Sequence, residues 1–224
     1  MDFSGIDSLI NENISKVRID IGLSFNAPIS RRWLEYFDDR IVIGIEPDPE
    51  NVQKIKDGTV NPFDGKAIPP MSFDRFFLIE AACDPDDVGQ KEFHKVKGMD
   101  TGCSSLYKPT SSDWSFDLIK VKTVNLSDLI EFLLDRFPFI EQIKTDTQGH
   151  DLIILKSIER HLSRIAFYDL ENGTSGQYQK ERDEDKALGF ITQKGFSLIE
   201  NSHGNHRFAN KRFSNINNES GVLD

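Results

Sequence analysis

The chain has 224 residues, of which 38% are hydrophobic, 10% aromatic and 29% charged, a composition typical of a soluble globular protein. Its 27 basic and 37 acidic side chains give a net charge of −10, which argues against a nucleic-acid-binding protein because such proteins need a basic face. Membrane insertion and secretion are not expected either, because no apolar run approaches the roughly 18 residues that span a bilayer and the acidic N-terminus is unlike a signal peptide.

The first part of the chain alternates apolar runs with segments of helical periodicity. The run IVIGIE is almost wholly apolar, which is typical of a strand buried on both faces of a parallel sheet. The segment PDPENVQKIKDG begins with acids, continues with lysines and stops at a glycine, as helices commonly do. Prolines between residues 58 and 74 indicate an irregular excursion. The elements predicted here are strands at 16–22, 41–46 and 75–82 and helices at 26–39 and 47–58.

The second part continues the alternation, with KEFHKVK and then FDLIKVKTV as strands. A helix is expected to begin at Ser127 or Asp128 and to end before Pro138. His203 and His206 lie in a basic stretch that we expect to be a solvated loop, and two histidines without a nearby carboxylate make a poor metal site. The other predicted elements are strands at 139–146, 165–171 and 195–200 and helices at 150–158 and 178–193.

This order of elements predicts an α/β fold with an open, mostly parallel sheet that is doubly wound, with helices on both faces. One hydrophobic core can serve a chain of up to roughly 250 residues, so we predict a single domain over residues 1–213 and a frayed tail at 214–224. Cys83 and Cys103 form no disulfide framework, and two cysteines without one fit the reducing cytoplasm.

In such sheets a ligand binds outside the carboxyl ends of the strands, where the strand order switches. The first strand end reads Asp20-Ile21-Gly22-Leu23-Ser24-Phe25-Asn26, and the small residues Gly22 and Ser24 would let a ligand approach the backbone. A dinucleotide fold has three glycines here and a pyrophosphate on the helix N-terminus. In this chain Asn26 replaces the third glycine, and the Asp20 carboxylate would repel a pyrophosphate. The turn therefore favours a cationic ligand without phosphate, such as S-adenosylmethionine.

Glu46 follows Asp20 by 26 residues and ends the next strand. An acid at that place is expected to accept hydrogen bonds from both ribose hydroxyls of the ligand. The alternatives are structural: Asp20 could bond backbone amides at its strand end, and Glu46 could be a solvated strand terminus before the next helix.

Three stretches of the chain resemble the FkbM-type S-adenosylmethionine-dependent methyltransferases. They are RIDIGLSFNAP, IGIEPDPENV and IKTDTQGHDLIIL, with weaker support from CSSL and VNLSDLI. The resemblance spans roughly residues 16–172 and implies a Rossmann-like class I methyltransferase fold with S-adenosylmethionine as its cofactor. The family pattern carries over onto five residues of this chain, namely Asp20, Gly22, Glu46, Asp146 and Gly149.

The chain departs from the family pattern at four positions. Asn26 stands where the family often has a glycine, and Ser127 stands where it often has an aspartate. Gln148 and Asp151 replace two glutamates that follow the strand predicted at 139–146. A role for Gln148 as a base is excluded, because an amide does not take up a proton at ordinary pH.

Methylation of a hydroxyl needs a group that takes the proton, and two residues are candidates. Asp146 ends the strand predicted at 139–146, and His150 follows it in the first helical turn with a side chain suited to base catalysis. The alternatives are that Asp146 caps the following helix and that His150 faces solvent.

Four further residues are predicted to contact the cofactor. Ala82 and Cys83 end the third strand, where small side chains would leave room for the adenine ring, although Cys83 could equally be buried filler. Ser104 and Ser105 lie in a loop that could close over the methyl donor or be an ordinary polar loop.

The function predicted from the sequence is an S-adenosylmethionine-dependent methyltransferase that acts on a hydroxyl of a small molecule or a glycan. Two alternatives are a nicotinamide-dependent oxidoreductase of similar architecture and a non-catalytic relative that binds the cofactor without turnover. Residues 58–74, 84–116 and 201–213 are expected to shape the acceptor pocket, because such loops vary freely on a constant scaffold. The sequence makes no prediction of the oligomeric state.

Overall fold

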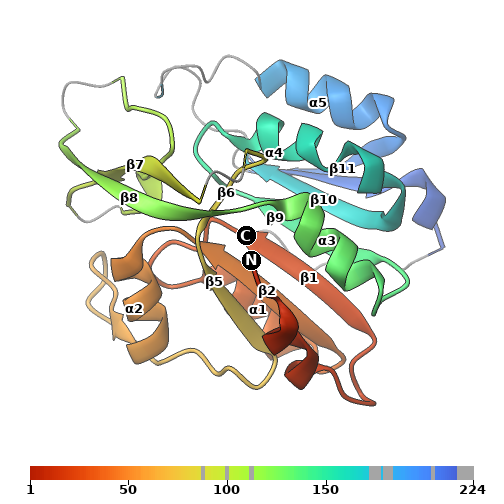
Figure 1. Ribbon diagram of the computed structural model, residues 1–224, viewed down its shortest axis with the longest axis horizontal. Helices are drawn as coiled ribbons and strands as arrows, with labels where there is room; N and C mark the ends of the chain where they lie inside the picture. The colour runs from red at the N-terminus through yellow and green to blue at the C-terminus, as the bar shows by residue number, and fades with distance from the viewer. Residues whose placement is uncertain are drawn as a thin grey trace.

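The computed structural model describes residues 1–86, 89–98, 101–110, 114–171, 178, 184–202 and 205–215. Most of this chain builds one seven-stranded sheet (Figure 1). Its strands are β1 (Lys16–Ile21), β2 (Arg40–Glu46), β5 (Phe76–Glu80), β9 (Ile140–Thr145), β10 (Ile165–Glu171), β11 (Phe196–Ser202) and β12 (Asn205–Asn210). They follow the order β11-β12-β10-β9-β1-β2-β5, and only β12 among them runs antiparallel to its neighbours.

Helices pack on both faces of this sheet. The helices α1 (Pro28–Tyr36) and α2 (Pro49–Asp57) cover one face, where they share a core with alternate residues of β2 and β5. The other face is covered by the 3₁₀-helix η1 (Ser4–Leu9) and by α3 (Leu126–Leu134), α4 (Asp151–Ser157) and α5 (Glu184–Gln193). The prediction of a doubly wound, mostly parallel α/β sheet is therefore confirmed.

The strands alternate their side chains between these two faces. In β1, Ile19 and Ile21 enter the core under α3 and α4, whereas Arg18 and Asp20 point to the face of α1. This two-residue period is inherent to a strand. It decides below which side chains of β1 can reach a ligand.

Local sequence sets the helix starts. The Oδ1 atom of Asp48 accepts a hydrogen bond from the Glu50 N–H (2.9 Å), so Asp48 caps α2, and Pro49 fills the first helical position. Helix α3 begins at Leu126, earlier than predicted, because the side chain of Asn125 accepts a hydrogen bond from the Ser127 N–H (2.9 Å). The expected start at Ser127 or Asp128 was therefore wrong by one or two residues.

The predicted strand at 75–82 is divided between two sheets. After β5, the N–H of Ala81 donates to the carbonyl of Glu46 (3.1 Å), and the chain then enters a second sheet. That sheet has the order β6-β8-β7 and lies beside the carboxyl ends of the central strands (Figure 1). Its strands are β6 (Ala82–Cys83), β7 (Gln90–Val96) and β8 (Phe116–Val124).

Two segments predicted as irregular contain strands. Residues 58–74 include a short hairpin of β3 (Thr59–Val60) and β4 (Ala67–Ile68). The basic stretch expected to be a solvated loop contains β12, in which His206 is only 6% exposed. The physical reason is that β12 is inserted between β10 and β11, where Arg207 is neutralised by Asp169 on the neighbouring strand (2.8 Å). His203 lies outside the described residues.

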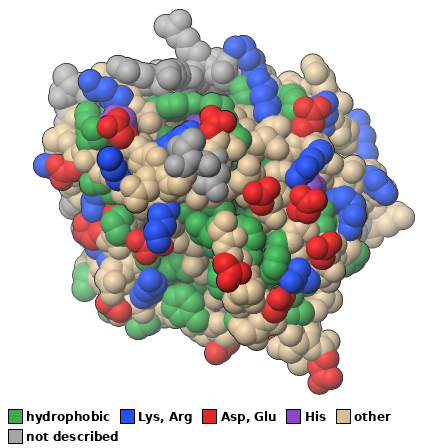
Figure 2. Space-filling view, viewed as in Figure 1, with side chains coloured by type: hydrophobic (Ala, Val, Ile, Leu, Met, Phe, Trp, Pro, Cys, Tyr) green, Lys and Arg blue, Asp and Glu red, His purple; other side chains and the backbone are tan. Residues whose placement is uncertain are grey.

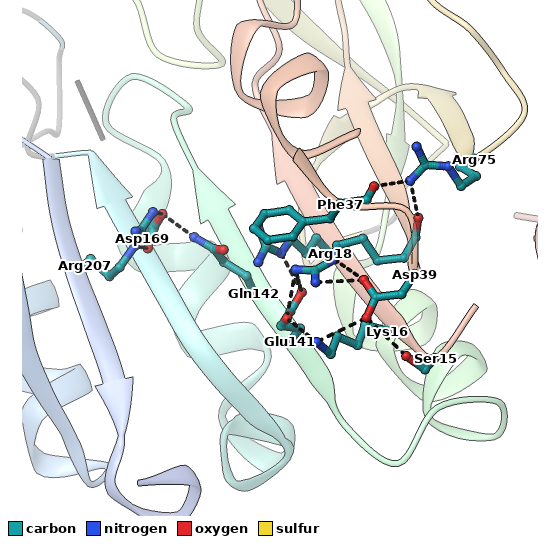
Figure 3. Close-up of polar contacts among 11 residues, drawn as sticks. Ser15, Lys16, Arg18, Phe37, Asp39, Arg75, Glu141, Gln142, Asp169 and Arg207 are labelled. Carbon is teal, nitrogen blue, oxygen red and sulfur yellow. Dashed lines mark hydrogen bonds and ion pairs between the residues drawn. The ribbon is translucent and has the colours of Figure 1, made fainter. Parts of the chain in front are cut away.

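Beside α1, the sheet carries a buried ionic cluster (Figure 3). The Nε atom of Arg18 and the Nη1 atom of Arg40 lie 2.6 and 2.8 Å from the same carboxylate oxygen of Glu141. Both guanidinium groups also lie over the ring of Phe37, with the Arg40 group 3.6 Å from the ring centroid. The cluster joins β1, β2 and β9 near the amino ends of these strands.

On the molecular face shown in Figure 2, acidic and basic side chains are interspersed. In the described part of the chain, no helix is both long enough and apolar enough to cross a membrane. Of the expected tail, 214–224, the structure describes only the first two residues.

Candidate functional site

A cavity opens at the carboxyl ends of β1, β2 and β9. From β1 the next strands of the sheet, β2 and β5, are added on one side. The later strands, from β9 to β12, are added on the other side of β1. The strand order therefore switches between β1 and β9. Ligands bind at such switch points in open α/β sheets. About 570 Å³ of the cavity is free of protein atoms, part of it open to solvent. Its described lining consists of Ile21, Gly22, Ser24, Ile45, Glu46, Pro47, Asn51, Ala81, Ala82, Cys83, Phe93, Thr101, Gly102, Ser104, Leu106, Asp146, Thr147 and His150.

The floor of the cavity depends on Gly22. Its N–H donates to the carbonyl of Ile45 (3.0 Å), and the N–H of Asp146 donates to the carbonyl of Ile21 (3.0 Å). These bonds join the ends of β1, β2 and β9. Gly22 has a left-handed φ of +82°, and a Cβ at this position would overlap the carbonyl oxygen of Asp146. The glycine predicted to admit a ligand is thus also required for the strand ends to meet.

Glu46 lies in the cavity wall, as predicted, but both of its oxygens already accept hydrogen bonds. Oε2 accepts from the N–H groups of Leu23 and Ser24, each at 3.0 Å. Oε1 accepts from the N–H of Asp48 (3.0 Å) and the side-chain amide of Asn51 (3.3 Å). Glu46 therefore holds the first turn against α2, and its predicted contact with ribose hydroxyls stays a prediction.

Burial raises the pKa of Glu46 to about 7, although four N–H donors favour its ionised form. The turn that it holds is itself unusual, because Ser24 has a left-handed φ of 57°. Such a conformation is uncommon for a residue with a side chain. The bond from the Ser24 N–H to Glu46 stabilises it.

The prediction that the Asp20 carboxylate meets the ligand directly is not supported by the structure. Asp20 is 1% exposed and lies outside the described lining of the cavity. Its Oδ2 accepts a hydrogen bond from the Ser30 hydroxyl on α1 (2.6 Å), and its Oδ1 lies 3.6 Å from the Lys144 Nζ. The reason is that Asp20 lies inside β1 rather than after it, so its side chain points to a face of the sheet.

Two other predicted residues also lie outside this lining. Asn26 is on the outer side of the first turn, where its carbonyl accepts a hydrogen bond from the Arg31 Nε (2.8 Å). The Ser105 hydroxyl donates to the carbonyl of Gln148 (2.8 Å), so Ser105 holds the turn after β9 in place. Neither prediction of a direct cofactor contact is supported.

Ala82, Cys83 and Ser104 do line the cavity, as predicted. Burial raises the pKa of the Cys83 thiol well above its usual range, which makes a thiolate nucleophile unfavourable there. The Ser104 hydroxyl donates to the carbonyl of Thr101 (2.9 Å) and accepts from the N–H of Val96 (3.0 Å), so it fixes the segment that covers the cavity.

Asp146 belongs to a charged network at the ends of β9 and β10. Its Oδ2 accepts from the Lys144 Nζ (3.1 Å), and its Oδ1 accepts from the amide of Gln148 (2.9 Å). The same amide reaches Glu171, at the end of β10 (2.9 Å). Burial and the neighbouring Asp146 charge raise the pKa of Glu171 to about 10, whereas the pKa of Asp146 is lowered because the Lys144 charge and these hydrogen bonds outweigh its burial.

His150 lines the cavity with a side chain that is only 5% exposed. Its Nε2 lies 3.1 Å from the Oδ2 of Asp84, the residue that follows β6. The alternative of a solvent-facing histidine is therefore wrong. The ring of Tyr107 packs edge-on against the imidazole, with 5.3 Å between ring centroids.

Four residues that line the cavity or contact its lining were not singled out by the sequence analysis. Asn51 and Thr101 are bonded to each other (3.0 Å) in the cavity wall, and both come from segments read only as helix or loop. Asp84 and Glu171 each lie at the end of an apolar strand, as Glu46 does. Extending the same search to every strand end could have found these two acids.

The charge of the cavity provides a test of the predicted cofactor. Its described lining includes two carboxylates, Glu46 and Asp146, and contains neither lysine nor arginine. A cationic ligand is favoured by such a wall, whereas a pyrophosphate is disfavoured. The residues present thus fit S-adenosylmethionine, which carries an ammonium and a sulfonium group.

Solved structures of methyltransferases resemble the chain at low sequence identity. The methyltransferase FkbM from Methylobacillus flagellatus KT is 14% identical, with a TM-score of 0.51 over 88% of this chain and 44% of that one. TrmK from M. capricolum, solved with S-adenosyl-homocysteine, is 10% identical, with a TM-score of 0.41 over 94% and 69% of the two chains. Precorrin-6y C5,15-methyltransferase from Geobacter metallireducens GS-15 is 13% identical, with a TM-score of 0.40 over 92% and 84%. The chain thus spans less than half the length of the Methylobacillus protein.

None of the curated proteins compared with the chain matches it. The sequence model of the methyltransferase FkbM domain, in contrast, matches residues 20–198, which is most of the chain. The predicted Rossmann-like methyltransferase fold and the cofactor of this family, S-adenosylmethionine, are thereby confirmed at the level of the family. The chain belongs to the methyltransferase FkbM domain family.

Proposed function

We propose that this chain transfers a methyl group from S-adenosylmethionine to a hydroxyl of a small molecule or a glycan. The observation that carries the proposal is the cavity at the strand switch point, which two carboxylates line without a lysine or arginine among its described residues. Family membership supports the reaction class. The cytoplasmic location stays a prediction.

The residues that would hold the cofactor come from three strand ends and the segment above them. Gly22 and Ser24 present backbone at the first turn, and Glu46 supplies a carboxyl group from the second strand. Ala82 and Cys83 leave space at the start of the second sheet. Ser104, held by its bonds to Thr101 and Val96, lines the cavity from the segment that follows β7.

S-adenosylmethionine supplies a methyl group that is already activated by its sulfonium. The protein must therefore hold the acceptor in line with the methyl–sulfur bond, and such positioning can contribute roughly 7–11 kcal/mol. It must also take the hydroxyl proton, for which a positioned base typically contributes ~10²–10⁴-fold. Asp146 and His150 are the two predicted bases, and both line the cavity.

The two alternative functions differ in what they require of this cavity. A nicotinamide-dependent oxidoreductase would place a pyrophosphate beside the first turn, where Glu46 and Asp146 provide negative charge. A non-catalytic relative was suggested by Gln148 and Asn26. In the structure, Gln148 bonds Asp146 and Glu171, and Asn26 contacts Arg31 on the outer side of the first turn, so neither departure falls on a residue of the described cavity lining.

Calorimetric titration with S-adenosylhomocysteine tests the cofactor, and fluorescence titration with NADH tests the oxidoreductase alternative. We expect heat with the first ligand, loss of that heat in Glu46→Ala, and no NADH binding. Methyl-labelled S-adenosylmethionine, offered with a panel of sugars, glycosides and alcohols, then tests transfer. Absence of heat at millimolar S-adenosylhomocysteine would contradict the proposal. Cofactor binding without transfer to any acceptor would favour the non-catalytic alternative.

A further inference from the structure

We propose that Asp84 is the positioning residue of the reaction, and that it orients His150 so that Nδ1 is the base that takes the acceptor proton. This inference rests on the proposed function. It adds a carboxylate that neither the sequence motifs nor the family pattern quoted above includes, and it assigns the base to one of the two candidates.

The His150 ring is fixed by its backbone and by contacts on two sides. It follows two consecutive left-handed residues, Gln148 (φ 54°) and Gly149 (φ 96°), and it occupies the N-cap position of α4. Its Nε2 lies 3.1 Å from the Asp84 Oδ2, and the Tyr107 ring packs edge-on against it at 67°. The imidazole therefore has a single orientation in the cavity wall.

The two ring nitrogens of His150 have different surroundings. A neutral imidazole carries one N–H, and a carboxylate next to Nε2 favours that N–H there. Nδ1 then keeps a lone pair. Within the described part of the chain, both ring nitrogens are buried and neither makes a hydrogen bond of good geometry, but only Nε2 has a carboxylate oxygen beside it, the Asp84 Oδ2 at 3.1 Å. A buried acceptor without a donor is unfavourable in the free protein and is ready to accept the proton of a bound hydroxyl.

Asp84 is suited to this role because its other contacts leave one oxygen for the histidine. Its Oδ1 accepts from the Lys91 Nζ (2.5 Å) and from the N–H of Asp86 (2.8 Å), whereas Oδ2 faces His150. Although burial alone would raise its pKa, the contacts with His150 and Lys91 lower the pKa of Asp84 to about 2. The carboxylate stays ionised and can stabilise the imidazolium that forms when Nδ1 takes a proton.

Asp146, the other predicted base, is less available. Each of its oxygens already accepts a hydrogen bond, one from Lys144 and one from Gln148. The neighbouring Lys144 charge and these bonds also lower its pKa, which makes it a weaker base. Asp146 therefore holds Lys144 and the turn after β9, while His150 acts on the acceptor.

The proton and electron balance of the step is simple. The acceptor O–H bond breaks and its proton moves to Nδ1 of His150, while the oxygen forms a bond to the methyl carbon. The methyl–sulfur bond breaks with its electron pair remaining on sulfur, which leaves a neutral thioether product. The Asp84 carboxylate beside His150 is itself paired with Lys91 of β7 (2.5 Å), and the Tyr107 ring packs against the imidazole.

Nuclear magnetic resonance of the imidazole nitrogens tests the pairing without an acceptor. In the wild-type protein we expect the neutral His150 to carry its proton on Nε2, as a slowly exchanging N–H that persists in Asp86→Asn and is lost in Asp84→Ala. Asp86 is a matched control because it neighbours Asp84 and also approaches Lys91 (3.8 Å), yet its side chain is 80% exposed. A wild-type proton on Nδ1 would overturn the proposal even if the Asp84 variants fail to fold.

Turnover tests the catalytic consequence, with methyl-labelled S-adenosylmethionine and the acceptor panel as probes. We expect His150→Gln to lower kcat by ~10²-fold or more, and Asp84→Asn to lower kcat at least ~10-fold with the KM for S-adenosylmethionine changed less than about twofold. Asp84→Glu should recover part of this loss. Normal turnover in folded Asp84→Asn would overturn the inference alone, whereas a wild-type protein that binds no S-adenosylhomocysteine would overturn the proposed function.

Discussion

The backbone carbonyl oxygen of Asp146 occupies the space in which a side chain at Gly22 would begin: a Cβ built on Gly22 would lie 1.8 Å from it. The two residues directly follow neighbouring parallel strands, and they are also linked through the Lys144 Nζ, which donates to the Gly22 carbonyl (3.1 Å) and to the Asp146 side chain (3.1 Å). The close contact between Gly22 and Asp146 thus holds the ends of β1 and β9 together and also forms the floor of the cavity.

Gly22→Ala should accordingly destabilise the protein by at least ~2–3 kcal/mol, because the strand ends must separate and a left-handed alanine is strained. Gly65→Ala is the matched control, since Gly65 has φ +73° with nothing within 4 Å of a Cβ. It should lose only about 1 kcal/mol. Urea denaturation of both variants provides the comparison. Equal losses would show that the contact with Asp146 has no energetic consequence.

The buried carboxyl of Glu46 should make stability depend on pH. Burial raises its pKa from 4.5 to about 7 in the folded protein, so the folded state retains a proton that the unfolded chain releases in this range. Stability should therefore fall as the pH rises from about 4.5 to about 7, by roughly 3 kcal/mol from this group alone. Glu46→Gln should lose this component of the pH slope.

Unfolding free energies at pH 5 and pH 8 measure the Glu46 effect as a difference between wild type and variant. Glu12→Gln, at an exposed position of the N-terminal segment, is the control and should keep the wild-type slope. A Glu46→Gln slope equal to that of the wild type would mean that the carboxyl is ionised in the folded protein throughout this range.

The buried cluster of Figure 3 predicts a large loss when its acid is neutralised. Glu141→Gln would remove the carboxylate that Arg18 and Arg40, which are 2% and 1% exposed, share, and only Arg40 has a second acid beside it, Asp39 at 2.8 Å. An uncompensated buried charge typically destabilises by about 3–5 kcal/mol. Glu131→Gln removes the partner of Arg160 in a pair whose side chains are 60% exposed or more, and it should change stability by less than ~1 kcal/mol. Similar thermal shifts in the two variants would contradict this account.

The central strands β2 and β10 could be predicted because each of them is a short, mostly apolar run in the sequence. IVIGIE and IAFYDLE are nearly continuous apolar runs, since both faces of a parallel sheet are covered by helices. The strand β12 has no such pattern, because its central residue Arg207 is buried through a pair with Asp169, 38 residues away. Local periodicity carries no signal for a partner at that distance.

The site was predictable where a residue comes at the end of its strand. This rule singled out Glu46, Ala82 and Asp146. His150 was chosen because it follows Asp146 by four residues in the sequence. All four residues line the cavity. Asp20 was misplaced because it lies one residue before the end of β1, where the two-residue period sends its side chain to the α1 face. Counting that period from Ile19 would have indicated this orientation.

The corrected position of Asp20 makes the last prediction. Asp20→Asn should keep an acceptor for the Ser30 hydroxyl but weaken the attraction for Lys144, which lies 3.6 Å away, and should destabilise by about 1–3 kcal/mol. The affinity for S-adenosylhomocysteine should change less than about threefold, because the carboxylate lies outside the described cavity lining. Ser30→Ala, which removes the other partner of Asp20, should behave in the same way. Calorimetry at a temperature where all three proteins are folded measures both variants against the wild type. A loss of affinity above ~10-fold in Asp20→Asn alone would mean that the charge of Asp20 acts on the ligand's ammonium, as the sequence first suggested.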